Sequence, residues 1–369
     1  MKPISADSHV CEPPNCYVDY IEPKYRADAP RVVRDANGAD AYWIKNEPKG
    51  VAIPLIAAAG RDPRDVGVRY NTYDEMYPGG WDGKVRLADQ DRDGVGGEVI
   101  YPSVGMALCR NPDVDYKQAC MNAYNRWLQE FVSAAPDRLF GVGQTAVRSV
   151  AEAVEDFRRI RDMGFKGVML PGVPGTAEDY DSPVFDPLWR AAVELGLPLS
   201  FHVLTSSADG LPRGPMINLW SGVVRSVQDI IGMFIFSGVF NRHPALKLVC
   251  VEGDAGWVPH FTYRLDHIYK RHRYVKKCVE LDRLPSQQFA ENIYLTFQDD
   301  WVAFRWVGLH DPASLNPRRL MWANDFPHND STWPNSQALL AEHTAGLSAQ
   351  EKAWILHDNV SELYGLAGH

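Results

Sequence analysis

Short apolar runs alternate with amphipathic stretches along almost the whole chain. Eight of the runs have the length and the β-branched and aromatic content of buried strands, and they lie at residues 4–9, 96–103, 140–147, 165–171, 197–203, 246–252, 292–297 and 319–325. Apolar side chains recur at helical spacing in several of the intervals, at residues 115–133, 150–163, 187–195 and 220–236. Strands that alternate with helices indicate a parallel sheet. The pattern therefore predicts the α/β class and a closed (β/α)8 TIM barrel.

The connection between the first and second predicted strands is much longer than the others. It is rich in Pro, Gly and aromatic residues, for example at residues 12–14 (EPP) and 77–83 (YPGGWDG). A structureless loop of that length is improbable in a compact domain, and loops that follow strands form the active-site face of a barrel. We therefore expect one barrel domain over residues 1–369, with a cap-like insertion at residues 12–93 and a smaller insertion at 206–218.

Composition and charge narrow the class of protein. Hydrophobic residues make up 45% and charged residues 23% of the chain, which is ordinary for a globular protein. The net charge of -9 argues against nucleic acid or an anionic membrane as a partner. The cysteines are scattered without a CxxC pair, no signal-peptide segment precedes the first strand, and no apolar run reaches the ~18 residues that span a bilayer. We therefore expect a cytoplasmic protein whose partner is a small-molecule substrate.

Acidic and imidazole side chains close three of the eight runs. Asp7 and His9 end the first run, His202 ends the fifth, and Asp325 ends the eighth. Taken singly, each has an ordinary alternative: an exposed strand end, a hydrogen-bonded core histidine or a helix N-cap. Asp7 and His9, however, are two apart on a strand and project to the same side. A closed barrel brings its strand ends to one rim, where these four side chains together would bind a divalent metal.

Several short motifs follow one another in a characteristic order. They are residues 7–13 (DSHVCEP), 164–168 (GFKGV), 201–202 (FH), 240–244 (FNRHP), 252–257 (EGDAGW), 292–297 (NIYLTF) and 324–328 (NDFPH). In this order and spacing they resemble the amidohydrolase superfamily, in the branch related to aminocarboxymuconate-semialdehyde decarboxylase. The resemblance runs from end to end of the chain. It implies a (β/α)8 barrel with a bound divalent metal, and a homodimer.

The metal ligands that the resemblance implies are Asp7, His9, His202 and Asp325. The usual first-strand motif of the family is His-x-His, or Glu-x-His in some aromatic-acid decarboxylases, whereas this chain has Asp-x-His. A set of two carboxylates and two imidazoles is harder than one carboxylate with three imidazoles. Manganese and iron are therefore as plausible as zinc.

Glu252 marks a second departure from the family. It stands at the end of the sixth strand, where the decarboxylase branch has a catalytic His and binuclear members have a ligand to a second metal. Glu252 could therefore act directly in catalysis, or hold a second metal with His202, bridged by Glu12 or Asp325. We accordingly expect one or two ions per chain. The alternative is that Glu252 interacts with the dipole of the following helix.

Asp325 has the most definite chemical task. A carboxylate beside a metal can take the proton of metal-activated water as that water attacks a carbonyl. His328 follows three residues later, and it either assists Asp325 or the substrate, or it caps the Pro-containing turn. Both interpretations stay open at the level of the sequence.

Three functions are compatible with these residues. The Asp-x-His motif and Glu252 favour a metal-dependent hydrolase that acts on an amide, ester, lactone, thioester or C–C bond of a small, apolar or aromatic organic acid. The alternative is non-oxidative decarboxylation of an aromatic or unsaturated acid, which is the activity of the nearest named family. A catalytically silent barrel is disfavoured because all four expected ligands are present. Candidates to bind a substrate carboxylate are Arg69, Arg86, Arg110 and Arg213.

Overall fold

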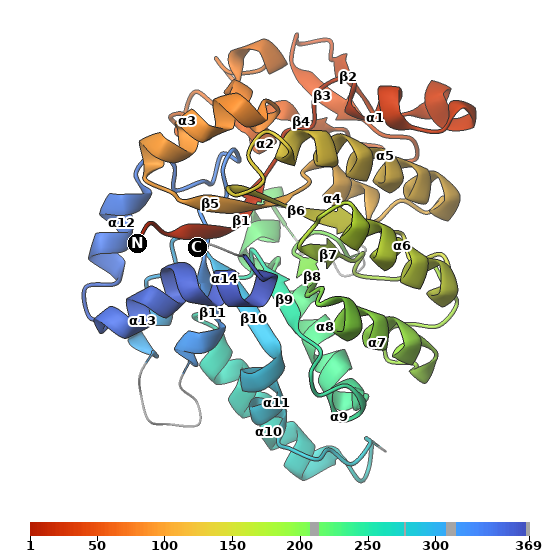
Figure 1. The fold of residues 1–369 in the computed structure, drawn as a ribbon, viewed down its shortest axis with the longest axis vertical. Helices are drawn as coiled ribbons and strands as arrows, with labels where there is room; N and C mark the ends of the chain where they lie inside the picture. The colour runs from red at the N-terminus through yellow and green to blue at the C-terminus, as the bar shows by residue number, and fades with distance from the viewer. Residues whose placement is uncertain (207–213, 277, 308–314, 367–369) are drawn as a thin grey trace.

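Eight parallel strands surround the centre of the molecule in the computed structural model, which describes residues 1–206, 214–276, 278–307 and 315–366 (Figure 1). In spatial order they are β1 (Ile4–His9), β5 (Gly97–Tyr101), β6 (Leu139–Gln144), β7 (Gly167–Met169), β8 (Leu199–His202), β9 (Leu248–Val251), β10 (Ile293–Phe297) and β11 (Leu320–Trp322). All eight predicted strands and the (β/α)8 barrel are confirmed. β1 has the predicted bounds, and the other seven strands are shorter than predicted, at one end or at both.

The interior of the barrel is packed with side chains. Apolar residues that alternate along the strands fill it, among them Ile4, Val99, Phe140, Val142, Met169, Val249, Val251 and Met321. Helix α14 (Asn359–Tyr364) packs against β1 and β11 at the amino ends of the strands, where Val360 and Tyr364 join the interior cluster. The Tyr364 hydroxyl lies 3.0 Å from that of Tyr101. The amino end of the barrel is thereby filled, as in other TIM barrels.

Helices cover the outside of the barrel (Figure 1). They are α4 (Val104–Leu108), α5 (Val114–Val132), α6 (Val150–Asp162), α7 (Asp186–Leu195), α8 (Arg225–Phe236), α9 (Val239–Arg242), α10 (Val258–His272), α11 (Pro285–Asn292), α12 (Ser336–His343) and α13 (Ala349–Ala353). Helix α6 shows why they form where predicted: Ser149 caps its first turn, and Ala153, Phe157 and Ile160 are buried on one side. The fourth predicted helix starts late, at Arg225, because the 3-10 helix η5 (Met216–Gly222) precedes it.

The segment between β1 and β5 has secondary structure of its own. It holds a three-stranded sheet of β2 (Arg31–Arg34), β3 (Asp40–Trp43) and β4 (Val51–Ala52), whose two strand pairings are antiparallel, and the helices α1 (Cys16–Tyr20), α2 (Ile53–Ala57) and α3 (Gly83–Asp93). Short 3-10 turns, η1 (Pro23–Asp28), η2 (Tyr73–Glu75) and η3 (Pro78–Gly80), connect them. Helix α1 packs against α5. The division of the chain into one barrel domain with a cap-like insertion stays a prediction.

The barrel closes between its first and last strands without a regular ladder. The backbone N–H of Asp325 donates to the carbonyl of Asp7 (3.1 Å), and the N–H of His9 donates to the carbonyl of Phe326 (2.7 Å). These bonds lie beyond the end of β11, at the carboxyl ends of the strands. They fix the two segments that carry the predicted metal ligands directly against each other.

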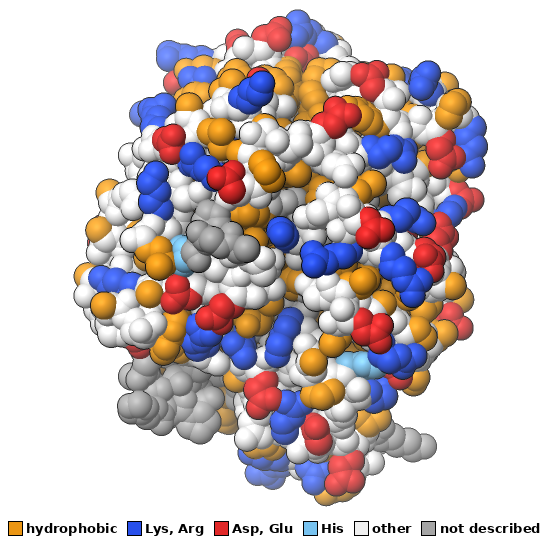
Figure 2. Space-filling view, in the orientation of Figure 1, with side chains coloured by type: hydrophobic (Ala, Val, Ile, Leu, Met, Phe, Trp, Pro, Cys, Tyr) orange, Lys and Arg blue, Asp and Glu red, His pale blue; other side chains and the backbone are white. Residues whose placement is uncertain are grey.

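The outer surface carries both charges. Figure 2 shows Lys and Arg side chains interspersed with Asp and Glu side chains over the face that is drawn. Within the described residues, one helical stretch, Ile217–Phe236, is long and apolar enough to cross a membrane by composition, with a mean hydropathy of 1.3. Its second half is α8, whose Val227, Ile230 and Phe234 pack into the main core. One buried face of this kind is typical of a barrel helix, and 28% of the apolar window is buried in all.

Candidate metal centre

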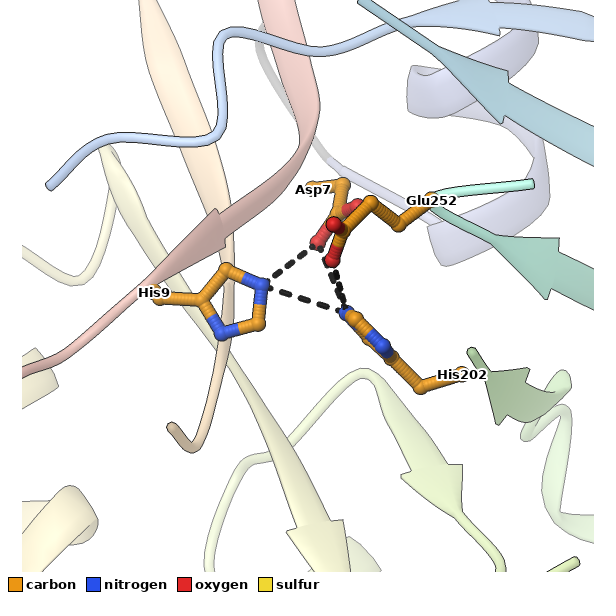
Figure 3. Close-up of side chains that lie close together, drawn as sticks. All are labelled: Asp7, His9, His202 and Glu252. Carbon is orange, nitrogen blue, oxygen red and sulfur yellow. Dashed lines mark hydrogen bonds and ion pairs between the residues drawn. The ribbon is translucent and has the colours of Figure 1, made fainter. Parts of the chain in front are cut away.

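Acidic and imidazole side chains from separate strand ends meet at the carboxyl end of the barrel (Figure 3). Asp7, His9, His202 and Glu252 each offer a ligand atom within 4.8 Å of the others, and His9, Glu252, Asp325 and His328 form a second such group. All lie buried or nearly so. The structure therefore brings together six of the seven site residues expected from the sequence.

A bulge in β1 aims the first two of these side chains. The register of β1 against β5 shifts between Ser5 and Ser8, so both serine hydroxyls point to one side, where they donate to the side-chain oxygen of Asn324. Asp7 and His9 point to the other side, into the barrel. An extra residue in one strand re-aims side chains in this way.

The two histidines each present one ring nitrogen to the same point. His9 Nδ1 lies 3.0 Å from the carbonyl oxygen of Pro102, and His202 Nδ1 lies 3.0 Å from that of Val203. A carbonyl only accepts, so each Nδ1 carries a proton and each Nε2 presents a lone pair in the neutral ring. The two Nε2 atoms are 3.2 Å apart. Lone pairs this close repel unless a cation lies between them, which is how metal-binding histidines are arranged.

Carboxylate oxygens at the same point have no hydrogen-bond partner among the described residues. Asp7 Oδ1 and Asp325 Oδ2 are buried in this state, whereas Asp325 Oδ1 faces ring nitrogens of His9 and His328. Asp7 Oδ1 lies 3.3 Å and Asp325 Oδ1 lies 3.4 Å from His9 Nε2. Buried carboxylates without donors are costly to keep ionised. A divalent cation would satisfy these oxygens and the imidazole lone pairs together, so the residues fit a metal site.

The protonation of the site reflects this crowding of charge. Burial opposes the charge of His202, but Asp7 and Glu252 outweigh it and raise the pKa of His202 to about 9. Burial also opposes the charge of Asp7, yet His202 and His9 lower its pKa. Burial and neighbouring carboxylates raise the pKa values of Glu252 and Asp325. A proton on His202 thus takes the place of a cation, and a metal that binds must displace it.

Two of the acidic residues hold an unusual backbone conformation. Glu252 has φ 56° and Asp325 has φ 55°, in the left-handed region that side chains with a Cβ rarely adopt. Each such residue costs on the order of 1–3 kcal/mol and persists where the surroundings enforce it, often at functional sites. Here the turn swings each carboxylate back over the end of its strand, toward the histidines.

His328 lies beside the candidate ligands in a chain of polar contacts. Its ring stacks on that of His9, with centroids 3.9 Å apart. The hydroxyl of Ser103 donates to the carbonyl of Val10 (2.6 Å) and lies 2.8 Å from His328 Nε2, so Nε2–H must donate to Ser103. His328 Nδ1 then faces Asp325 Oδ1 at 3.0 Å. Two lone pairs at that separation need a shared proton, so the pair of Asp325 and His328 holds one proton.

Glu12 does not join this group. Its buried carboxylate accepts hydrogen bonds from the backbone N–H groups of Val104 (3.0 Å) and Gly105 (3.1 Å), at the start of α4, and from the Tyr17 hydroxyl (3.2 Å). Both oxygens are therefore engaged away from the other carboxylates. Glu12 therefore caps the first turn of α4. Its contacts do not support the metal bridge that was expected from the sequence.

The free energy of unfolding is expected to fall as Glu12 ionises. Burial is the largest influence and raises the pKa of Glu12 from 4.5 to about 7, so the folded protein keeps a proton that the unfolded chain has released. This stabilisation is complete below pH 4.5 and is lost as the pH rises through about 7, and it amounts to about 3 kcal/mol. Denaturant unfolding between about pH 4.5 and pH 8 should show the slope in the wild type. Glu12→Gln should lack it, and equal slopes would contradict the assignment.

Sequence reasoning missed the groups that support the ligands. The Pro102 carbonyl holds His9 and the Ser103 hydroxyl holds His328. The Thr296 hydroxyl accepts from the backbone N–H of Glu252 (2.8 Å) and approaches Asp7 Oδ2 (3.4 Å). Each of these groups lies at the carboxyl end of a predicted strand. That position was the available signal, because the end of a barrel strand faces the active site.

The four arginines that were candidates to bind a substrate carboxylate differ in their burial and in their contacts. Arg86 is fully buried and its donors are used within the protein, so it is not free to bind a substrate. Arg69 is 73% exposed, and Arg213 lies outside the described residues. Arg110 is half-buried and donates to the carbonyl of Leu204 (2.7 Å), just beyond β8. Of the described three, Arg110 is the one that is partly exposed and contacts the loop after a ligand-bearing strand, two residues beyond His202.

Comparisons with known proteins agree with this fold. An amidohydrolase from Mycobacterium avium subsp. paratuberculosis shares 20% identity over 99% of both chains, with a TM-score of 0.74. A 5-carboxyvanillate decarboxylase from Sphingomonas paucimobilis also shares 20% identity over 99% of both chains, with a TM-score of 0.70. The 5-carboxyvanillate decarboxylase from Novosphingobium aromaticivorans, with manganese and 4-hydroxy-3-methoxy-5-nitrobenzoic acid, shares 21% identity over 76% of this chain and 79% of its own, with a TM-score of 0.61.

No curated protein sequence matches the chain significantly. The family model described as Amidohydrolase, in contrast, matches residues 76–366, which is most of the chain and includes the ends of seven barrel strands. This match confirms the resemblance inferred from the motifs. The chain belongs to the amidohydrolase family.

Proposed function

We propose that the protein is a metal-dependent carboxy-lyase that removes CO2 non-oxidatively from an aromatic or unsaturated organic acid. The observation that carries the proposal is the Asp325–His328 pair, which holds one proton beside the candidate ligands at a separation of 3.0 Å. Loss of CO2 leaves an electron pair on carbon, and a positioned acid must deliver a proton there. Decarboxylases of similar fold support the proposal.

The metal would be held by Asp7, His9, His202 and Glu252, with Asp325 at its edge. Three carboxylates and two imidazoles form a hard donor set, which favours manganese or iron over zinc, and one decarboxylase of similar fold contains manganese. When bound, such an ion supplies Lewis acidity that holds substrate oxygens and draws electron density from the carbon that loses CO2. We propose one ion per chain, because the two ligand groups share His9 and Glu252.

The proton path follows from the hydrogen bonds. Ser103 accepts from His328 Nε2–H, which turns Nδ1 toward Asp325 Oδ1. As the C–C bond breaks, CO2 leaves and the electron pair stays on the substrate carbon. Asp325 then gives the shared proton to that carbon, and a C–H bond forms. The Asp325 carboxylate recovers a proton from solvent water through His328, which restores the pair for the next turnover.

The surroundings suit a flat, apolar substrate with an acidic group. Phe326 packs against Trp333, with ring centroids 5.1 Å apart, and Trp333 packs against Tyr77 at 4.9 Å. Phe326 directly follows Asp325, and although Phe326 and Trp333 are buried, this cluster makes the segment that carries Asp325 apolar. Arg110 keeps donors beyond the one given to Leu204 and would bind a second anionic substituent.

Hydrolysis is the second candidate, and the observation that favours it is Glu252. Its side chain is 17% exposed and lies 3.4 Å from His202 Nε2, at the position where the decarboxylase branch has a histidine. A carboxylate there can take a proton from water. The sequence alone favoured hydrolysis for this reason, whereas the proton-sharing pair and the similar folds favour decarboxylation.

Activity assays of manganese-loaded and chelator-treated protein would separate the two reactions. We expect release of CO2 from 5-carboxyvanillate or simple hydroxybenzoic acids by the loaded protein, and none after metal removal. Metal analysis should give one ion per chain. Hydrolysis of aryl esters or lactones without CO2 release from any acid would instead establish the second candidate. Two ions per chain would contradict the proposed stoichiometry.

A further inference from the structure

Arg86 connects helix α3 to two segments of the candidate metal centre. These are the end of β1, which carries His9, and the segment after β11, which carries Asp325. It is fully buried, although arginine is almost never fully buried unless it is paired. One nitrogen, Nη1, donates to the carbonyl of His9 (2.8 Å) and to that of Gly79 (3.2 Å). The other, Nη2, donates to the carbonyl of Phe326 (3.1 Å). A single guanidinium thus joins the backbone of His9, a candidate ligand, to that of Phe326, which follows Asp325 at the edge of the metal site.

The charge of Arg86 is balanced within the same cluster. Its Nε donates to Glu98 Oε2 at 2.6 Å, and Gln90 donates to the same oxygen at 2.7 Å. The guanidinium also lies over the Phe326 ring, 4.5 Å from its centroid. The planar guanidinium is therefore fixed by hydrogen bonds along its edge and by the Phe326 ring against its face, so it has little freedom to move.

We propose that Arg86 is a positioning residue that sets the spacing of the metal ligands without touching the metal. The inference rests on the metal site of the proposed function. The barrel seam between β1 and β11 has only isolated backbone bonds there, such as His9 N–H to Phe326 carbonyl, so no regular ladder fixes the spacing of Asp7 and His9 from Asp325. Groups behind metal ligands typically change metal affinity by about 10–100-fold.

Arg86→Lys tests this inference because lysine keeps the charge beside Glu98 but has no planar fork to hold two carbonyls. Arg138 provides the matched control: it donates to Asp91 (3.0 Å) and to the carbonyls of Gly96 (3.1 Å) and Val95 (3.2 Å). Those contacts lie at the amino end of β5, away from the metal centre. Arg138→Lys therefore loses the same kinds of contact at the opposite end of the barrel.

The measurement is the Mn²⁺ dissociation constant by calorimetry, together with the melting temperature of the metal-free proteins. We expect Arg86→Lys to weaken Mn²⁺ binding at least about 10-fold, and Arg138→Lys to leave it within twofold of wild type while lowering the melting temperature. Equal Mn²⁺ affinity in Arg86→Lys and wild type would overturn the inference. Wild-type protein that binds no Mn²⁺ would overturn the metal site itself, which is a distinguishable result.

A second variant covers the case in which Arg86→Lys fails to fold. The double variant Arg86→Met with Glu98→Leu removes both members of the buried pair, a replacement that is often neutral for stability. It also removes every bond from residue 86 to the two ligand segments. A folded double variant should bind Mn²⁺ at least about 10-fold more weakly than wild type, and unchanged affinity would again overturn the inference.

Discussion

Replacing His202 by Ala is expected to lower the affinity for Mn²⁺ at least about 100-fold and to abolish activity. Loss of a hydrogen-bond partner behind a ligand already costs about 10–100-fold in metal affinity, and His202 supplies a ligand atom itself. It is the imidazole from the far side of the barrel, with Nε2 3.2 Å from that of His9 and 3.4 Å from Glu252 Oε2. Without it, the remaining ligands come from β1 and from the segments after β9 and β11.

Thermal unfolding with and without Mn²⁺ would measure this loss. A ligand at 1,000 times its dissociation constant stabilises the folded state by about 4 kcal/mol, which raises the melting temperature of a chain of this length by about 5 °C. The wild type should show this shift and His202→Ala should show almost none. His243→Ala is the control, because His243 is buried and pairs with Asp186 (3.0 Å) outside the site. It should melt earlier yet keep the Mn²⁺ shift, and a full shift in His202→Ala would refute the assignment.

The fold and the convergence of the candidate ligands were predictable because both follow from periodicity. A run such as residues 246–252 can be recognised as a buried strand from its composition, and parallel strands in a barrel must end at one rim. Asp7, His9, His202 and Asp325 stand at such ends, so their convergence followed from topology alone. The structure adds what no sequence pattern encodes: carboxylate oxygens of Asp7 and Asp325 without hydrogen-bond donors, and the Nε2 atoms of His9 and His202 that face each other.

The rest depends on contacts between distant segments. Glu12 lies three residues after His9 and looked like a possible bridge, but the chain turns its carboxylate onto the N–H groups of Val104 and Gly105. Arg86 was a candidate to bind a substrate carboxylate, yet helix α3 buries it against Glu98. Burial of charged side chains is decided by which segments pack together, and a single sequence does not give that information.

Replacing Asp325 by Asn is expected to lower kcat at least about 100-fold, because a positioned acid or base contributes about 10²–10⁴-fold to a rate. Asparagine keeps the size of the side chain but cannot give up and recover the proton shared with His328. The group formed by Asp7, His9, His202 and Glu252 stays intact, so Mn²⁺ should still bind. Steady-state kinetics and metal analysis of the same preparation measure both effects. Unchanged kcat with bound metal would exclude Asp325 as the proton donor.

His328→Gln separates proton transfer from metal binding more cleanly, because it keeps Asp325, at the edge of the metal site, as well as Asp7, His9, His202 and Glu252. We expect kcat to fall about 100-fold, with Mn²⁺ affinity and KM changed only a few-fold. His357→Gln is the matched control: His357 Nδ1 lies 3.0 Å from Asp358 Oδ1, the same separation as in the Asp325–His328 pair, but on the helical turn Trp354–Asp358. Loss of that pair should leave kcat unchanged. A similar fall in both variants would mean that His328 acts only through the stability of the fold, and the proton path proposed above would be wrong.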